Sequence, residues 1–241
     1  NLDYLSLANN FIRTVMPNAF NHLKKLSTLI LSYNSISKLH SHAFKNLENL
    51  NELNLEHNQL VELESNTFSG LKRLNFLYLR NNRIQKLNDD AFDGLAELKM
   101  LEVNQNSIGA ISSHVFANLT KVTQLNLSDN QITFVDENAF KGLANLRSLL
   151  LNKSCMKIIE PRVFNGQSQL YELVINSSQM EELSEFSFIN LNNLSMLTLS
   201  NSLISSIDAN AFNCLFNLTV LDLSFCLIRS LGNHVFQCLT K

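Results

Sequence analysis

The chain has 241 residues, and its 19 Lys and Arg against 21 Asp and Glu give a formal net charge of −2 and a pI near 6.3. This balance provides no basic field for nucleic acid or for an anionic lipid surface. The sequence has no apolar stretch of the length of about 18 residues that a transmembrane helix needs. We therefore predict no nucleic-acid partner and no membrane insertion by this segment.

A 24-residue repeat runs through the whole chain. With Leu2 as position 1, ten repeats cover residues 2–241 without insertion or deletion, and position 19 is Phe in every one. Positions 4, 6, 11 and 14 are aliphatic or Met throughout. Such a period indicates a solenoid, in which each repeat buries its apolar face against its neighbours. One continuous array is predicted. Neither end departs from the pattern as a cap would, so we expect an uncapped interior part of a longer protein.

Each repeat is predicted to begin with a short strand, because positions 2 to 8 alternate around the leucines at 4 and 6. Stacked in parallel, ten strands form one sheet with positions 3 and 5 on its open face. Position 9 is Asn in the first six repeats, and a carboxamide there can both donate and accept where the chain leaves the sheet. These predicted ladder residues are Asn10, Asn34, Asn58, Asn82, Asn106 and Asn130.

The outer half of each repeat is predicted to contain short turns or 3-10 segments rather than full helices. Position 17 is often Asn or Asp, which suits the cap of a brief helical turn carrying the Phe. Position 21 is Gly or Asn in seven of ten repeats, which indicates a backbone site with positive φ. These seven residues are Asn46, Gly70, Gly94, Asn118, Gly142, Gly166 and Asn190.

The pattern L-x-x-L-x-L-x-x-N-x-I-x-x-L-x-x-x-x-F-x-x-L resembles the leucine-rich repeat of the 24-residue "typical" subclass over residues 2–241. The resemblance implies an α/β-type repeat solenoid, a curved horseshoe with a concave parallel β-sheet and a Phe spine near its convex side. The subclass is found mostly in extracellular animal proteins such as Toll-like receptors, Slit, small proteoglycans and lamprey variable lymphocyte receptors. It implies an extracellular protein, secreted or in a cell-surface ectodomain, that recognises protein, most often through the concave face.

Repeats seven to ten depart from the pattern at position 9, where Ser154, Ser178, Ser202 and Cys226 replace Asn. These residues are smaller and form fewer hydrogen bonds, so a weaker ladder is expected there. One interpretation is tolerated drift, and the other is a change in curvature or local stability near residues 154–202. Repeat seven also carries Gln167 where the other repeats have Leu at position 22.

The four cysteines do not form the cluster of a repeat cap. Cys226 is expected to be a buried free thiol. Cys214 and Cys238 share position 21 of adjacent turns, where stacking places Cα atoms within disulfide range. A bridge between them and two unpaired thiols both remain possible. Paired C-x-x-C spacing and close His partners are absent, so no zinc site is predicted.

Six N-x-S/T sequons allow N-glycans, and all of them fall in repeats five to nine. Three lie on the outer turns, one lies on the sheet at position 5, and two lie at the sheet margin at position 7. Glycans on the last three would obstruct the concave face in repeats six to eight. In chain order the sequons begin at Asn118, Asn126, Asn152, Asn176, Asn193 and Asn217.

No motif for catalysis or cofactor binding is present: the sequence has no P-loop, G-x-G-x-x-G, H-E-x-x-H or G-x-S-x-G. His40 and His42 form an H-x-H pair at positions 15 and 17, where we interpret them as solvated turn residues rather than metal ligands. We predict no enzyme, no cofactor and no metal.

Large side chains on the open strand face are not needed for folding and therefore mark a candidate binding surface. Residues at the same position of successive repeats are neighbours, so Phe76, Tyr78, Arg80 and Met100 should lie together. Exposed aromatic, Met and Arg clusters are typical of interface hot spots. The full candidate set is Ile30, Tyr33, Glu56, His57, Phe76, Tyr78, Arg80, Met100 and Glu102.

Two functions fit the sequence. The first is part of a receptor ectodomain or secreted binder that engages a protein ligand through the concave face. The second is a structural or adhesive protein of a matrix or cell surface, in which the array is a self-associating scaffold. The aromatic–Arg cluster and the uneven sequons favour the first, while the regular 24-residue period slightly favours the second.

Overall fold

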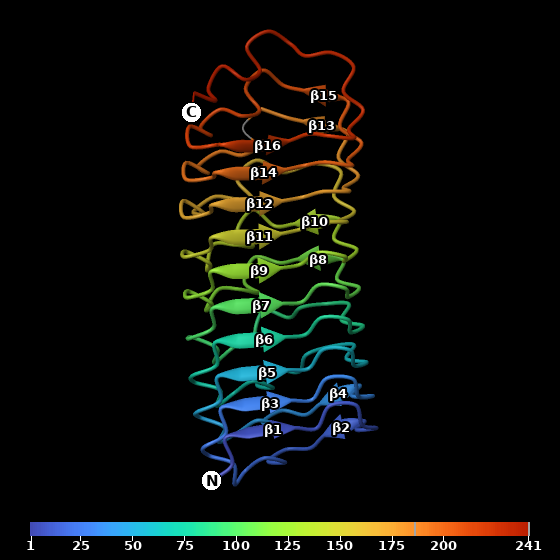
Figure 1. The fold of residues 1–241 in the computed structure, drawn as a ribbon, viewed down its shortest axis with the longest axis vertical. Helices are drawn as coiled ribbons and strands as arrows, with labels where there is room; N and C mark the ends of the chain where they lie inside the picture. The colour runs from blue at the N-terminus through green and yellow to red at the C-terminus, as the bar shows by residue number, and fades with distance from the viewer. Residues whose placement is uncertain (186, 241) are drawn as a thin grey trace.

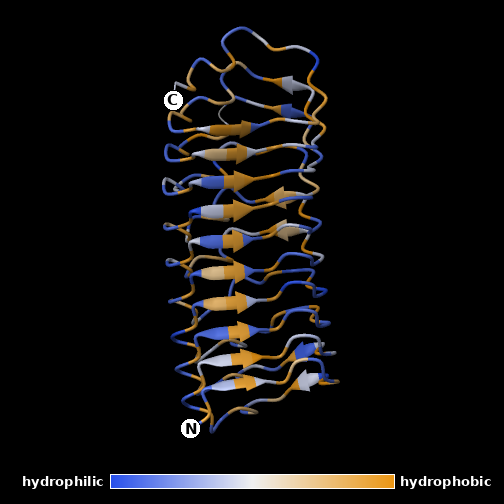
Figure 2. Ribbon diagram, viewed as in Figure 1, coloured by the Kyte–Doolittle hydropathy of each residue, from blue (hydrophilic) through white to orange (hydrophobic). Residues whose placement is uncertain are grey.

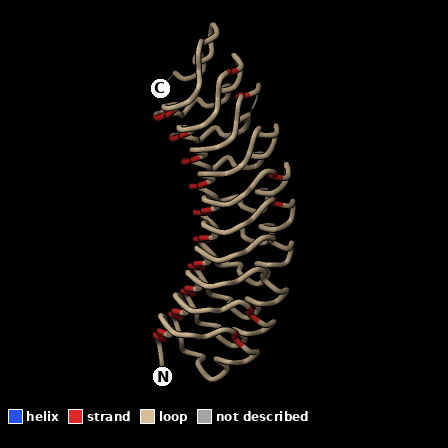
Figure 3. The backbone as a smooth tube through the Cα atoms, turned by 90° about the vertical axis from the view of Figure 1, so that its right-hand side faces the viewer, coloured by secondary structure: helices blue, strands red, loops and turns tan. Residues whose placement is uncertain are grey.

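The computed structural model describes residues 1–185 and 187–240 of the chain. Each repeat forms one turn of a curved solenoid, with the amino-terminal and carboxy-terminal turns at opposite ends of the long axis (Figure 1). Seen from the side, the strands line the concave surface, and loops and turns form the rest of each coil (Figure 3). The predicted curved horseshoe is therefore confirmed.

One ten-stranded parallel sheet forms the concave face, and each of its strands spans positions 3 to 5 of one repeat. Its register matches equal positions of successive repeats, as in Leu53 opposite Leu77. Strictly equal repeat lengths explain this, because any insertion would shift the pairing. In sheet order the strands are β1 (Tyr4–Ser6), β3 (Thr28–Ile30), β5 (Glu52–Asn54), β6 (Phe76–Tyr78), β7 (Met100–Glu102), β9 (Gln124–Asn126), β11 (Ser148–Leu150), β12 (Glu172–Val174), β14 (Met196–Thr198) and β16 (Val220–Asp222).

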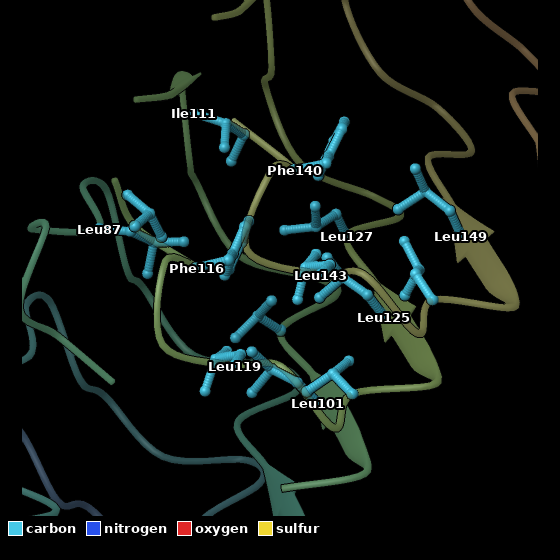
Figure 4. Close-up of a cluster of buried hydrophobic side chains, with 14 of the residues drawn as sticks. Leu87, Leu101, Ile111, Phe116, Leu119, Leu125, Leu127, Phe140, Leu143 and Leu149 are labelled. Carbon is cyan, nitrogen blue, oxygen red and sulfur yellow. The ribbon is translucent and has the colours of Figure 1, made fainter. Parts of the chain in front are cut away.

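The core is a continuous hydrophobic column inside the coil. The central residue of each strand is hydrophobic along the whole sheet (Figure 2), and Leu77, Leu101 and Leu149 are fully buried. Opposite them, the ten position-19 rings stack with centroids 5.9 Å to 6.5 Å apart and interplanar angles of 4° to 20°. Phe116 and Phe140 illustrate how this spine packs against the leucines of neighbouring turns (Figure 4). The implied Phe spine is confirmed.

The asparagine ladder satisfies backbone N–H and carbonyl groups where the chain leaves the sheet. Asn58 Nδ2 donates to the carbonyl oxygens of Leu31 and Leu55 at 3.0 Å and 3.1 Å, and Asn58 Oδ1 accepts the Ile36 N–H at 2.9 Å. The same pattern recurs through Asn130. Asn10, in the first turn, is exposed and bonds only to carbonyls of its own repeat.

After repeat six the ladder changes. Ser154 Oγ is buried without a hydrogen-bond partner, whereas Ser178 Oγ lies 2.9 Å from Ser202 Oγ. Cys226 Sγ donates to the Leu199 carbonyl at 3.4 Å, which reproduces one ladder bond weakly, and the side chain is only half-buried. Repeat seven is therefore the weakest point of this column.

This change predicts a local difference in hydrogen exchange. The Ile108 N–H donates to Asn130 Oδ1 at 3.0 Å, but the next N–H in the column, that of Ile132, has no such acceptor because Ser154 replaces Asn. A buried N–H without a partner opens more easily. We expect the Ile132 amide to exchange at least about tenfold faster than the Ile108 amide, measured by NMR. Equal protection of the two amides would favour simple drift.

The convex side contains turns, and the described residues form no α-helix or 3-10 helix. The prediction of a cap at position 17 is wrong for Asn18 and Asn66, which have positive φ, a conformation that an N-cap residue does not adopt; Asp90, Asn138 and Asn210 do not have positive φ. Capping-type bonds come from position 15 instead, where Asp136 and Asp208 each accept the N–H two residues ahead.

Position 21 has positive φ in six repeats. Five of these residues are Gly or Asn, as predicted, and the sixth is Cys214. Asn118 and Gly142 do not have positive φ. Gly142 is required for another reason, because a Cβ built on it would collide with the Phe116 carbonyl oxygen. The neighbouring turn thus leaves no space for a side chain at this glycine.

A second left-handed site, at position 8, was not predicted. All ten residues there have φ between 53° and 58°, and none is Gly; they are Asn9, Tyr33, His57, Asn81, Gln105, Asp129, Lys153, Ser177, Asn201 and Phe225. Bonds between repeats hold this conformation, as in the Ser177 N–H donating to the Ser200 carbonyl at 2.8 Å. This backbone turn directs the position-8 side chains along the sheet margin.

The energetic cost of the left-handed backbone at position 8 can be measured at Ser177. Left-handed backbone costs a residue with a Cβ roughly 1–2 kcal/mol, and a β-branched residue more. We expect Ser177→Val to lower the free energy of unfolding by about 1–2 kcal/mol, while Ser177→Gly leaves it unchanged or raises it slightly. Urea unfolding of the two variants tests this, and equal effects would contradict the strain.

The four cysteines are free thiols. The Cys214–Cys238 bridge is not formed, and Cys238 Sγ lies 3.1 Å from Asn213 Oδ1 instead. Of the two alternatives left by the sequence, the structure has the unpaired thiols.

Candidate concave binding site

Four of the predicted site residues lie together at the centre of the concave sheet. Phe76 and Tyr78 are at the two ends of β6, and they pair in register with Met100 and Glu102 of β7. All four are half-buried, because each side chain stands between its counterparts on the neighbouring strands. We call these four residues the concave patch.

The other candidates lie at different distances from the concave patch. Arg80 and Glu56 follow the ends of neighbouring strands, and exposed Arg80 donates through Nε to Gln105 Oε1 at 3.0 Å. Ile30 is set apart, because Asn54 lies between Ile30 and Tyr78 in the sheet.

Tyr33 and His57 form a separate pair at the sheet margin. Their rings stack with centroids 4.2 Å apart and an interplanar angle of 9°. Asn81 Nδ2 lies 2.7 Å from His57 Nδ1. All three occupy the left-handed position 8, so the stack is a consequence of the backbone conformation that the sequence did not reveal.

Carboxylates surround the concave patch. Burial raises the pKa of the Tyr78 hydroxyl, and the nearby charges of Glu52, Glu102 and Glu56 raise it further. Glu52, which is not among the predicted site residues, pairs in register with Phe76. The column rule that placed Phe76 beside Met100 applies equally to Glu52. The site therefore combines an apolar and aromatic centre with negative charge.

The Glu102 carboxyl group has a raised pKa. Burial raises its pKa, and Glu56 raises it further, while the hydrogen bond from Asn126 and the charge of Arg80 lower it. Asn126 Nδ2 donates to Glu102 Oε2 at 2.7 Å. The net result is a carboxyl group whose charged form is disfavoured in the folded protein.

This shift predicts the effect of pH on stability. A raised pKa means that the contribution of Glu102 to stability is fully present below its unfolded pKa and is lost as the pH rises through the folded value. Glu102→Gln keeps an acceptor for Asn126 but carries no charge. We expect the stability of the variant relative to the original protein to increase as the pH rises from 4 to 7, measured by urea unfolding. A difference independent of pH would contradict this.

The sequon asparagines fall into two groups by their bonds. The side-chain nitrogens of Asn118 and Asn193 donate to Asp93 Oδ1 and to the Ser168 carbonyl, and that of Asn126 donates to Glu102. Asn217 Nδ2 likewise donates to the Asn192 carbonyl.

In contrast, Asn152 and Asn176 accept through Oδ1 from the next repeat, at 3.1 Å and 2.9 Å. Their Nδ2 groups, to which a glycan would attach, are not used in these bonds. Both lie directly after a strand of the main sheet, at the margin of the concave face.

The described residues contain no group of three or more His, Cys, Asp or Glu side chains that could hold a metal. His42 is exposed and His40 is half-buried. A helix that could cross a bilayer is also absent from the part of the chain that the structure describes.

Family profiles match the whole chain. A leucine-rich repeat profile matches residues 1–36, 24–84 and 73–132, which together span more than half of the sequence. The chain belongs to the leucine-rich repeat family. A second profile, for BspA-type leucine-rich repeat regions, matches residues 109–241 of this leucine-rich repeat chain. No curated protein sequence matches it significantly.

Solved structures of the family are similar over nearly the full array. TLR13 in complex with ssRNA13 has a TM-score of 0.87 and 28% identity, and covers 98% of this chain. A leucine-rich repeat protein of Leptospira interrogans has a TM-score of 0.81 and 25% identity over 98% of the chain. The Drosophila Toll–Spatzle complex has a TM-score of 0.77 and 22% identity over 99% of the chain, and shows the fold alone.

This leucine-rich repeat chain is shorter than these neighbours. It spans 38% of the TLR13 chain, 58% of the Leptospira chain and 35% of the Toll chain.

Proposed function

We propose that this leucine-rich repeat array is an extracellular protein-recognition module, part of a receptor ectodomain or a secreted binder. It binds a protein ligand through the concave face of repeats two to five. The observation that carries the proposal is the concave patch, where the partly exposed side chains of Phe76, Tyr78 and Met100 gather on adjacent strands. Such a surface is not needed to close the core, which lies on the other side of the sheet.

The charges around the concave patch favour a protein ligand over a nucleic acid. The structurally similar TLR13 is in complex with single-stranded RNA, whereas Toll is in complex with the protein Spatzle. RNA binding needs cations for the phosphate backbone. Here Glu52, Glu56 and Glu102 surround Tyr78, which repels phosphates and suits a protein surface with basic residues at its rim.

The positions of the sequons also favour ligand binding at repeats two to five of the concave face. N-glycans at Asn152 and Asn176 would project from the sheet margin in repeats seven and eight, where the Nδ2 groups are not used in the ladder bonds. Asn126, in register with Glu102, already uses its Nδ2 in a bond to that residue, so the concave patch would remain accessible on a protein with N-glycans at Asn152 and Asn176.

A self-associating adhesive or matrix scaffold is the second candidate, favoured by the unbroken 24-residue period. Sedimentation analysis at increasing protein concentration distinguishes the two functions. A monomer at the highest concentrations supports a separate ligand, and reversible dimers that are lost in Phe76→Ala/Tyr78→Ala support self-association through the concave face.

The ligand can be sought with the array as bait against a panel of extracellular protein domains, with Phe76→Ala/Tyr78→Ala as a parallel bait. A ligand of the concave face binds the original protein and not the double variant. Binding of the same set of domains by both baits would contradict the proposed site.

A further inference from the structure

One flank of the solenoid carries short strand pairs with gaps between them, and repeat seven lies in one of these gaps. Short strand pairs connect neighbouring turns on this side: β2 (Thr14–Val15) with β4 (Lys38–Leu39), β8 (Ala110–Ile111) with β10 (Phe134–Val135), and β13 (Glu182–Leu183) with β15 (Ser206–Ile207). Thus repeats five and six are paired, and so are repeats eight and nine. In the described residues, repeats three, four, seven and ten have no paired strand on this flank.

An apolar pocket lies between the turns of repeats six and seven, which are not paired with each other on this flank. It has a volume of about 140 Å³, and its lining includes Phe134, Met156, Ile158, Ile159, Val163 and Phe164. Phe134 and Ile158 are 53% and 48% exposed. Together they present an open apolar entrance on the flank of the molecule.

The pocket reaches the core. Met156 is 5% exposed, whereas its counterparts Ile132 and Met180 are fully buried, and at the other side of the pocket Val135 and Ile159 are 5% and 6% exposed. Solvent therefore touches the hydrophobic column at repeat seven. The same repeat has the unpartnered Ser154 Oγ and the substitution of Gln167 for Leu, so its packing differs on several sides.

The residues that line the pocket determine which kind of ligand can bind there. Its polar groups are few: Thr133 Oγ1 already donates to the Gly109 carbonyl, and Glu160 is exposed. An ordered water needs two to four polar partners, and a cavity of about 150 Å³ lined by Leu, Ile and Phe stays dry and binds benzene. We propose that this pocket binds a small apolar molecule of the size of one aromatic ring. It is separate from the concave patch, and its occupancy does not depend on the proposed function.

Benzene and xenon are suitable probes. We expect saturable benzene binding by titration calorimetry, and xenon density between Phe134, Met156 and Val163 in pressurised crystals. Ile158→Trp places a larger ring at the entrance of the pocket and should weaken benzene binding at least tenfold. Because Ile158 is partly exposed, this variant should remain folded, which circular dichroism checks.

Two further variants keep the test decisive. Val163→Phe fills the pocket from inside and should also weaken benzene binding at least tenfold. Val61→Trp places the same ring on an exposed flank position of repeat three, away from the pocket, and should leave the affinity within twofold. The proposal is overturned if the original protein shows no saturable binding up to the solubility of benzene. It is also overturned if the three variants bind benzene equally well.

Discussion

Phe116→Ala is expected to lower the free energy of unfolding by about 3–5 kcal/mol, among the largest effects of any single substitution in this protein. Phe116 is fully buried and lies between two other rings of the spine, with centroids 5.9 Å from Phe92 and 6.3 Å from Phe140. The sheet and the ladder hold the turns on both sides at a fixed spacing, so the cavity left by the ring cannot collapse.

The measurement is urea unfolding, supported by the thermal midpoint, which should fall by roughly 10 °C for a chain of this length. Phe11→Ala serves as a control, because Phe11 is 92% exposed and its loss should change the unfolding free energy by at most about 0.5 kcal/mol. If Phe116→Ala costs less than about 1 kcal/mol, the spine is not a main source of stability.

Phe76→Ala combined with Tyr78→Ala is expected to reduce the affinity for a ligand of the concave face at least about 100-fold. Aromatic hot spots at the centre of an interface each contribute about 2 kcal/mol or more, so the pair together exceeds the roughly 2.8 kcal/mol that a 100-fold change requires. Both side chains are half-buried on the open face, and Leu77 between them keeps the core intact. The double variant should therefore remain folded while it loses binding.

Met196→Ala is the matched control for the double variant. Met196 occupies position 3 of repeat nine, the position that Phe76 has in repeat four, and is also half-buried. We expect its substitution to leave the affinity within threefold, measured by surface plasmon resonance. If both variants lose affinity equally, the contact covers the whole concave face and is not centred on the concave patch.

The sequence predicted the sheet well because a constant repeat length determines its register. Once Leu77 and Leu101 occupy equal positions of successive repeats, their strands pair in parallel. The left-handed backbone at position 8 could not be predicted, because residues as different as Tyr33, Lys153 and Phe225 adopt it and none is glycine. Hydrogen bonds between repeats impose that conformation, and they are visible only in the assembled coil.

For the candidate site, the sequence predicted which residues are neighbours but not their side-chain contacts. The rule that equal positions are neighbours predicted the pairs Phe76–Met100 and Tyr78–Glu102, and both are present. The bond from Asn126 to Glu102 and the Tyr33–His57 stack could not be predicted, since they depend on side-chain directions. The pocket at repeat seven was missed for a related reason: its residues continue the apolar pattern, and the space between them depends on how the side chains of repeats six and seven pack.

Site-specific photo-cross-linking tests most directly whether recognition uses the concave face. A benzoylphenylalanine replaces Gln124, an exposed residue of β9 in register with Met100, so that the concave patch itself is unchanged. A second protein carries it at Glu182, an exposed residue of β13 on the flank. We expect the ligand protein to cross-link from position 124 and not from position 182. Cross-linking from position 182 alone would contradict recognition by the concave face.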